Sequence, residues 1–324
     1  MLAEIIKTLQ SNRRKIVFTE GEDARILEAA SRLIADGIMD VVLCGSADKV
    51  KSAAEASGFN IAEAKIVDPL NFADIDSMVD KMVELRQGKM SADECREALK
   101  KSNYFGTMYV KLGLADGLLG GATYSTADTV RPALQIIRTK PGSKIVSSCF
   151  IMYRQTESGI EKYAMADCAI NIAPDEDQLV EIALETAETA RLFGIEPKVA
   201  MLSYSSKGSG SGESVDKVRN ATEKIKASNP SFDVDGELQF DAAIDPVVAA
   251  TKVKGSTVAG QANTFVFPDI NSGNIGYKIA QRLGGFEAYG PILQGLNAPI
   301  NDLSRGCSAD EVYAMAIITL GLKK

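Results

Sequence analysis

The chain has 324 residues, of which 45% are hydrophobic and 24% charged, and its formal net charge is −7 at pH 7. Such a composition is that of an ordinary globular protein, and the length predicts two domains. An acidic chain lacks the basic face that nucleic acids require, and no apolar run is long enough to span a bilayer, so we expect neither a nucleic-acid nor a membrane partner.

The first residues mix charged and apolar side chains as an amphipathic helix does, and unlike a signal peptide, so we expect a cytoplasmic protein. Five cysteines are scattered along the chain without any C-x-x-C spacing, which argues against a disulfide framework and against a zinc site. The chain contains no histidine. Acid–base chemistry must therefore use a carboxylate, Lys, Tyr or Cys.

Short β-rich runs alternate with amphipathic helical patterns along the first half of the chain. This alternation predicts a parallel sheet with helices on both faces, and hence a doubly wound α/β fold. The expected strands are 15–19, 40–44, 64–67 and 115–119, and the expected helices are 23–35, 47–57, 75–86 and 127–138.

A longer strand is expected at 144–152, and the turn dipeptide Pro141-Gly142 before it marks a change of domain. Further along, we expect a helix at 175–193, a strand at 198–202, a helix at 215–227, a strand at 264–267 and helices at 276–283 and 309–320. The last helix could pack on either domain. If it docks on the first, the loop before it lies in the cleft between the domains, where ligand sites are common.

The segment 295–311 gathers polar and turn-forming residues immediately before that last, apolar helix. Ser308 and Glu311 have the spacing of a capping box. The polar side chains at or just before the helix N-terminus are Ser304, Arg305, Asp310 and Glu311. Backbone N–H groups there favour anions, and a carboxylate beside a Ser-Arg pair is a candidate for catalysis. The alternative is that Glu311 simply caps its helix.

Residues 120–132 also lead from an expected strand into a helix. Ser125 or Thr126 has the residue type of an N-cap, and these hydroxyls could bind a phosphate. Arg131, about one turn further on, offers a planar fork to phosphate oxygens. Pro132 suggests that the helix begins later or bends there. A plain capped helix is the alternative.

Two more polar loops follow expected strands. Asn271 and Asn274 could bond a ligand oxygen, although turn chemistry explains them equally well. The Ser/Gly-rich run 203–212 has the form of a phosphate cradle or of a flexible connector, and it lacks the Walker A order. Since ligands bind at the carboxyl ends of parallel strands, these loops together predict a cleft enzyme for an anionic substrate.

Five segments closely resemble the phosphate acetyltransferase (phosphotransacetylase) family, and the resemblance covers essentially the whole chain. They are Phe105-Gly-Thr-Met, Ala115-Asp-Gly-Leu-Leu-Gly-Gly-Ala, Ser125-Thr-Ala-Asp-Thr-Val-Arg-Pro-Ala-Leu-Gln-Ile-Ile, Pro268-Asp-Ile-Asn-Ser-Gly-Asn-Ile-Gly-Tyr-Lys and Pro299-Ile-Asn-Asp-Leu-Ser-Arg-Gly. The family interconverts acetyl-CoA and phosphate with acetyl phosphate and CoA, with no metal or organic cofactor.

The resemblance implies a homodimer of chains with two three-layer α/β/α domains and mostly parallel sheets, as in isocitrate and isopropylmalate dehydrogenases, with the active-site cleft between them. Domain I would comprise 1–142 and 296–324, and domain II 143–295.

The resemblance also implies roles for individual residues. Ser304 and Arg305 match the catalytic pair, and Arg131 matches an arginine that binds phosphate or CoA. Arg86 matches a second CoA-contacting arginine less distinctively, since a solvated helix end explains it as well. Ser125, Thr126, Asn271, Asn274 and Lys278 are expected to bind substrate. One position departs from the family, whose base is an aspartate seven residues after the serine: here that position is Glu311, preceded by Asp310.

A CoA thiol with a pKa of about 8.5 is mostly protonated at neutral pH, so Glu311 or Asp310 would take its proton before the thiolate attacks the acetyl group. We expect direct transfer with both substrates bound; a covalent route through Cys307 would lack a His partner. The rival readings are a phosphate butyryltransferase, a decarboxylating dehydrogenase of the same fold, and a CoA-binding module without catalysis.

Overall fold

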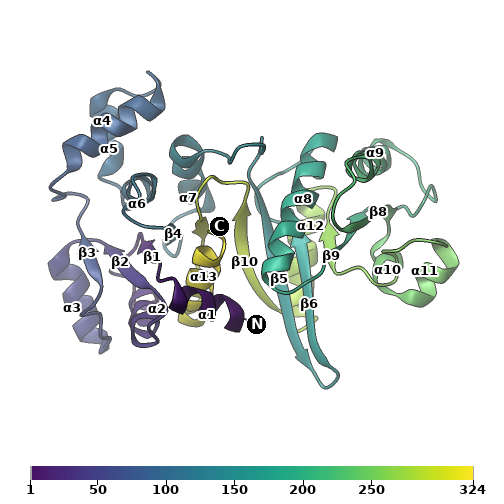
Figure 1. Ribbon diagram of the computed structural model, residues 1–324, viewed down its shortest axis with the longest axis horizontal. Helices are drawn as coiled ribbons and strands as arrows, with labels where there is room; N and C mark the ends of the chain where they lie inside the picture. Colours follow the sequence, from purple (N-terminus) through teal and green to yellow (C-terminus); the bar gives the residue numbers. More distant parts are fainter. Residues whose placement is uncertain (1, 324) are drawn as a thin grey trace. The chain divides into compact units, whose positions relative to one another are not determined.

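The computed structural model describes residues 2–323. The chain divides into two compact units, Met1–Pro141 with Leu296–Lys324, and Gly142–Gly295. Each unit contains one sheet with helices on both sides (Figure 1). Two mostly parallel α/β sheets therefore confirm the predicted fold class, while the likeness to the two dehydrogenases stays a prediction. No helix within residues 2–323 is long and apolar enough to cross a membrane.

The first unit has a five-stranded sheet in the order β11-β4-β1-β2-β3. All of its neighbouring strands are parallel. The strands are β1 (Lys15–Phe18), β2 (Asp40–Cys44), β3 (Lys65–Val67), β4 (Gly117–Gly120) and β11 (Ile300–Asp302). Because they are parallel, the loops that leave β1, β4 and β11 emerge at the same edge of the sheet.

Helices cover both faces of this sheet (Figure 1). One face carries α1 (Ala3–Ser11), α2 (Ala24–Ala35), α3 (Ala47–Ser57) and α13 (Ala309–Gly321). The other face carries α4 (Ile75–Arg86), α5 (Ala92–Leu99), α6 (Ser102–Lys111), α7 (Thr126–Pro132) and a π-helical turn, η1 (Ala133–Ile137).

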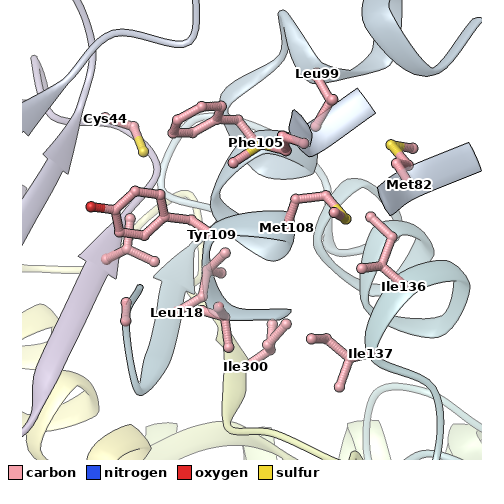
Figure 2. Packing of buried hydrophobic residues seen from close by; sticks show 14 of the residues in the cluster. Cys44, Met82, Leu99, Phe105, Met108, Tyr109, Leu118, Ile136, Ile137 and Ile300 are labelled. Carbon is pink, nitrogen blue, oxygen red and sulfur yellow. The ribbon is translucent and has the colours of Figure 1, made fainter. Parts of the chain in front are cut away.

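A hydrophobic core fills the space between the sheet and this second layer (Figure 2). Its members include Cys44, Met82, Leu99, Phe105, Met108, Tyr109, Leu118, Ile136, Ile137 and Ile300. Gly106 lets α6 lie close to the sheet, since a Cβ there would be only 2.9 Å from Cδ1 of Leu118. The same core fixes β4 and η1, the elements on either side of α7.

The second unit has a six-stranded sheet in the order β10-β5-β6-β9-β7-β8. The pairs from β6 to β8 are parallel, whereas β5 pairs antiparallel with β6 and β10. The strands are β5 (Ser147–Thr156), β6 (Gly159–Ala166), β7 (Lys198–Leu202), β8 (Asp233–Leu238), β9 (Thr264–Val266) and β10 (Glu287–Gln294). One face packs against α8 (Glu176–Leu192) and α9 (Glu213–Ala227), and the other against α10 (Phe240–Ile244), α11 (Pro246–Lys252) and α12 (Ile270–Arg282).

Three elements differ from the sequence-based expectations. The helix expected at 276–283 begins earlier, at Ile270, because the Asp269 side chain accepts a hydrogen bond from Ser272 N at 2.9 Å and caps it there. The helix around Pro132 does not begin late; it starts at Thr126 and continues into the π-helical turn. The long strand lies at 147–156 rather than at 144–152.

Candidate functional site

The candidate site begins at the edge of the first sheet where β11, β4 and β1 end. The backbone N–H of Leu303, after β11, donates to the carbonyl of Gly120, the last residue of β4, at 2.7 Å. Thr19, after β1, donates its N–H to Leu119 on the other side of β4 at 3.4 Å. The loops that carry Ser304 and Ser125, which are far apart in the sequence, therefore leave the sheet side by side.

Ser304 and Arg305 lie in a tight turn between β11 and α13. The Cys307 N–H donates to the Ser304 carbonyl at 3.0 Å, and the Gly306 N–H donates to Ser304 Oγ at 3.3 Å. The side chains of Ser304 and Arg305 are both exposed. A hydroxyl and a guanidinium are thus presented to solvent on a turn whose backbone is fixed.

The two candidate bases take different partners. Glu311 completes a capping box with Ser308: its Oε2 accepts from Ser308 N at 2.7 Å, and its N–H donates to Ser308 Oγ at 3.2 Å. Asp310 instead forms an ion pair with Arg32 of α2 at 2.6 Å, and its side chain is 82% exposed. The negative charge of Glu311 helps to raise the pKa of the Cys307 thiol, so its carboxylate faces the turn. Glu311 is the better placed of the two.

Arg25, at the start of α2, forms hydrogen bonds with this turn. Its NH1 donates to the carbonyls of Arg305 at 2.8 Å and Cys307 at 3.2 Å, and its NH2 donates to the Ala122 carbonyl at 2.9 Å. Asp23, the N-cap of α2, pairs with the same guanidinium at 2.7 Å. One arginine therefore joins the loops after β4 and β11 to α2.

Two carboxylates, the half-buried Glu20 and the buried Asp302, lie against the loop after β4. Glu20 accepts hydrogen bonds from the N–H groups of Gly121 at 3.1 Å and Thr123 at 2.7 Å, and burial raises its pKa. Asp302 ends β11 with 1% of its surface exposed. Burial raises the pKa of Asp302 to about 6, although hydrogen bonds from Thr126 and Thr129 oppose the shift.

The hydroxyls that the sequence assigned to phosphate binding already have acceptors within the protein. Ser125 Oγ donates to Asp128 Oδ2 at 2.7 Å, and Thr126 Oγ1 donates to Asp302 Oδ2 at 2.6 Å. A phosphate at this position would have to compete with these two carboxylates for the hydroxyl protons. Substrate binding by Ser125 and Thr126 stays a prediction.

Arg131 and Arg86 come together around Tyr104 of α6. Both guanidinium groups lower the pKa of Tyr104 against the stronger effect of burial, which raises it. Arg86 ends α4 and donates to the Gln135 carbonyl at 3.2 Å, and the Tyr104 hydroxyl donates to the Gln135 side chain at 2.9 Å. Arg131 is exposed. Arg131 and Arg86, which the resemblance to the family selected, thus both lie near enough to Tyr104 to act on its hydroxyl, and they are called the basic cluster below.

The remaining predicted residues lie in α12 of the second unit. Asn271 is exposed, and Asn274 donates its side-chain amide to the Cys168 carbonyl at 2.9 Å. Lys278 is exposed, with its ammonium 5.8 Å from the centre of the Tyr277 ring. Asn274 therefore supports a neighbouring loop, and the substrate roles of Asn271, Asn274 and Lys278 stay predictions.

The Ser/Gly-rich run of the second unit contacts a carboxylate side chain of the protein itself. Buried Glu237 accepts from the Gly208 N–H at 2.6 Å and from Ser205 Oγ at 3.1 Å. Lys207 pairs with Asp235 and donates to the Gly236 carbonyl at 2.7 Å. An internal carboxylate therefore occupies the cradle that the sequence pattern suggested for phosphate.

The second unit also contains an apolar pocket of about 500 Å³ between its sheet, α10 and α12. The lining residues are Met152, Arg154, Tyr163, Met165, Phe240, Ile244, Phe265, Phe267, Gly276, Ile279, Ala280 and Phe286. The Arg154 guanidinium is already paired with Glu161. This lining contains no carboxylate or thiol. Among the described residues, no group of three or more Cys, Asp or Glu could hold a metal ion.

Sequence reasoning missed Glu20, Arg25 and Asp302. Glu20 follows a strand directly, so the same strand-end rule that selected the other loops could have found it. Asp302 lies inside the motif that selected Ser304, yet nothing in the sequence shows that its carboxylate turns toward α7. Arg25 has no local signal, because its partners are far away in the chain.

Comparison with known proteins places the whole chain among proteins of one family. The family model described as "Phosphate acetyl/butaryl transferase" matches residues 1–320. A phosphate acetyltransferase of Bacillus subtilis is 51% identical over 322 residues, covering 98% of each chain.

Two solved structures are also similar to this chain. A phosphotransacetylase from Streptococcus pyogenes has a TM-score of 0.95 and 53% identity, covering 98% of this chain and 96% of its own. A branched-chain phosphotransacylase from Enterococcus faecalis has a TM-score of 0.69 and 19% identity, covering 96% of this chain and 100% of its own, and shares the fold.

The raised pKa of Asp302 predicts a pH-dependent stability. An unfolded aspartate has a pKa of about 3.9, whereas that of Asp302 in the fold is about 6. Because the folded state holds this proton more tightly, the contribution is fully present below pH 4 and is lost as the pH rises through 6. From pH 5 to pH 7.5, the free energy of unfolding of the wild type should fall relative to that of Asp302→Asn by roughly 1–1.5 kcal/mol.

Urea unfolding of both proteins at the two pH values measures this change, and groups common to both proteins cancel in the difference. A difference that is the same at pH 5 and pH 7.5 would show that Asp302 does not titrate in this range.

Proposed function

The chain belongs to the phosphate acetyl/butaryl transferase family, and we propose that it interconverts acetyl-CoA and phosphate with CoA and acetyl phosphate. It is an acyltransferase. The observation that carries the proposal is the exposed Ser304-Arg305 turn, with the Glu311 carboxylate at its base and a basic cluster on the same unit. These groups suit a reaction between a thiol and an acyl phosphate.

In the direction of acetyl-CoA synthesis, Glu311 takes the proton of the CoA thiol. The thiolate then attacks the carbonyl carbon of acetyl phosphate, a C–S bond forms, the C–O bond to phosphate breaks, and the electron pair leaves with the phosphate. The proton passes to the phosphate product, so the carboxylate is regenerated. General-base assistance of this kind typically contributes about 10²–10⁴ in rate.

Arg305 and Ser304 act on the charge that develops during this step. The guanidinium of Arg305 balances charge on the phosphate, and the Ser304 hydroxyl donates to the carbonyl oxygen as it becomes negative. Arg131 and Arg86 bind the phosphates of CoA, for which planar forks are well suited. Ser125, Thr126, Asn271, Asn274 and Lys278 complete the proposed binding residues. Both substrates are bound before transfer, in a ternary complex.

A butyryl substrate is the second candidate, because the family includes both acyl groups. The two activities differ only in the volume that the acyl group occupies, so the rates with acetyl and butyryl phosphate distinguish them. We propose acetyl because the B. subtilis relative, at 51% identity, is an acetyltransferase, whereas the likeness to the branched-chain enzyme is at 19% identity.

We further propose that the enzyme is a cytoplasmic homodimer that needs no metal or organic cofactor. All five cysteines are free and buried, which suits a reducing compartment. On α12 and at its C-cap, Ile275, Ile279 and Leu283 expose 57%, 53% and 85% of their surfaces at four-residue spacing. A second copy of the chain covering this apolar row would remove it from water.

Incubation with acetyl phosphate and CoA, read by thioester absorbance, tests the function. We expect acetyl-CoA to form equally well in EDTA. Arg305→Ala should lower kcat by about 10²–10³, the usual loss on removing one such donor, while the thermal unfolding midpoint is unchanged because the side chain is exposed.

Folded wild-type protein that forms no thioester would overturn the proposed function, and near-normal turnover of Arg305→Ala would remove Arg305 from the mechanism. Inactivation by EDTA that magnesium reverses would instead favour the dehydrogenase class.

The two acidic residues are separated by amide substitutions. Glu311→Gln keeps an acceptor for the Ser308 N–H and hence the cap, but it cannot take a proton, so kcat should fall by about 10²–10⁴. The loss should shrink as the pH approaches the thiol pKa of about 8.5.

Asp310→Asn, the matched control, loses only an exposed ion pair with Arg32 and should stay near wild-type activity. If Asp310→Asn loses most of its kcat and Glu311→Gln keeps nearly all of it, Glu311 serves only as a cap.

Cys307 should be dispensable for turnover. Burial raises the pKa of this thiol to about 11, so very little thiolate is present at neutral pH. Cys307→Ser should retain most of the activity, and initial rates at varied CoA and acetyl phosphate should give intersecting double-reciprocal lines. Parallel lines, or an acetyl-enzyme trapped on Cys307, would require a covalent intermediate.

A further inference from the structure

Asp302 connects the strand that leads to the catalytic turn with the helix that carries Arg131. It is the last residue of β11, two positions before Ser304. Its Oδ2 accepts a hydrogen bond from Thr126 Oγ1 at 2.6 Å, and its Oδ1 accepts one from Thr129 Oγ1 at 2.5 Å. Both carboxylate oxygens are therefore bonded to successive turns of α7.

Helix α7 depends on such contacts for its position. It has only seven residues, fewer than an isolated helix needs for stability. Further side-chain tethers are Asn103 of α6, whose amide donates to the Asp128 carbonyl at 2.7 Å, and Tyr124, which shares a hydrogen bond with Thr129. Arg131 lies in the last turn of α7, two residues after Thr129. Of these tethers, the Asp302 carboxylate is the one that joins α7 to the strand leading to Ser304.

The loop that enters α7 is shaped around the same carboxylate. Gly121 has φ of +102°, and a Cβ at this position would lie 2.3 Å from Asp302 Oδ1. The second of the two consecutive glycines is therefore required by the approach of Asp302. On the opposite side, Glu20 holds Gly121 and Thr123 by their N–H groups. The half-buried Glu20 therefore holds this loop by hydrogen bonds, and the buried Asp302 packs against it.

Burial of the ionised Asp302 carboxylate lowers the stability of the fold. The partners of Asp302 are neutral hydroxyls, and burial together with the nearby Glu20 charge disfavours its ionised form. A packed apolar pair would hold a helix to a strand at lower cost. An apolar contact, however, would not fix the direction of α7 by two hydrogen bonds.

We propose that Asp302 is a positioning residue for the acyl transfer, one that acts by holding α7 so that Arg131 keeps a fixed place relative to the Ser304-Arg305 turn. The inference rests on the proposed function. It assigns Asp302 no contact with substrate. Substitution of Asp302 should therefore weaken the binding of CoA, because Arg131 would no longer be held in place.

A double-mutant cycle on kcat/KM for CoA tests this role, with Asp302→Asn and Arg131→Ala measured singly and together. We expect Asp302→Asn to lower kcat/KM by about 10–100-fold, mainly through a higher KM for CoA with little change in KM for acetyl phosphate. Arg131→Ala should cost at least ten times less in the Asp302→Asn background than in the wild type, because residues in one network are not additive.

Asp116→Asn is the matched control. Asp116 lies in the same unit just before β4, at the other end of that strand, and accepts a hydrogen bond from Lys15 N at 2.7 Å. Its removal should lower stability and leave the cost of Arg131→Ala unchanged. Circular dichroism and thermal unfolding of every variant show which of them are folded.

If Asp302→Asn does not fold, Thr129→Val replaces it in the cycle, since it keeps the side-chain shape and removes one of the two bonds. Additive costs, or an Arg131→Ala variant as active as the wild type, would overturn the positioning role. Wild-type protein that forms no acetyl-CoA would instead overturn the proposed function, so the two failures are distinct.

Discussion

The parallel pairing of β11 with β4 brings the end of the chain back beside its first third. Ile300 pairs with Leu118 and Asp302 with Gly120, and β4 pairs with β1 on its other side. Buried Asn301 of β11 donates to the Thr319 hydroxyl at 2.9 Å, which ties the strand to α13. Without this pairing, the Ser304-Arg305 turn would have no fixed relation to α7 or to Arg25, and the candidate site would be several unconnected loops.

Buried aspartates in the two units show that hydrogen-bond partners decide whether a buried carboxylate stabilises or destabilises the fold. In the second unit, burial raises the pKa of Asp235, but hydrogen bonds from Lys207, Ser256 and Lys226 outweigh it and lower the pKa to about 2. Asp302 accepts only hydroxyls, and its pKa is raised to about 6. The first arrangement stabilises the fold at neutral pH, whereas the second lowers its stability. A carboxylate that destabilises its own fold beside a reactive turn is better explained by positioning than by stability.

The sequence predicted what depends on local patterns. The capping box of Ser308 and Glu311 and the strand runs are encoded within a few residues, and the expected elements of the first half lie close to those observed. The strands β6, β8, β10 and β11 were missed. β8 carries the buried acids Asp235 and Glu237, which conceal its strand character until their partners are known.

The missed site residues share one physical property: their partners are distant in the chain. Arg25 is defined by carbonyls of the loops after β4 and β11, and Asp302 by hydroxyls of α7. No spacing rule within one segment reports such contacts. The Ser/Gly-rich run shows the same limit, since its pattern allowed a phosphate cradle or a flexible connector, and only the fold shows that the run contacts Glu237.

The Glu311 carboxylate can cap α13 and also serve as the proposed base. The capping bond fixes Oε2 against the Ser308 N–H, which orients the carboxylate at low entropic cost because the helix N-terminus is already ordered. Oε1 takes no part in the cap, so a thiol proton can be accepted without breaking it. The side chain of Asp310, one residue earlier, points instead to Arg32 on α2. In the proposed mechanism, a base held by the start of α13 would move with the Ser304-Arg305 turn, so the proton acceptor and the charge-balancing groups would keep their spacing when the substrates bind.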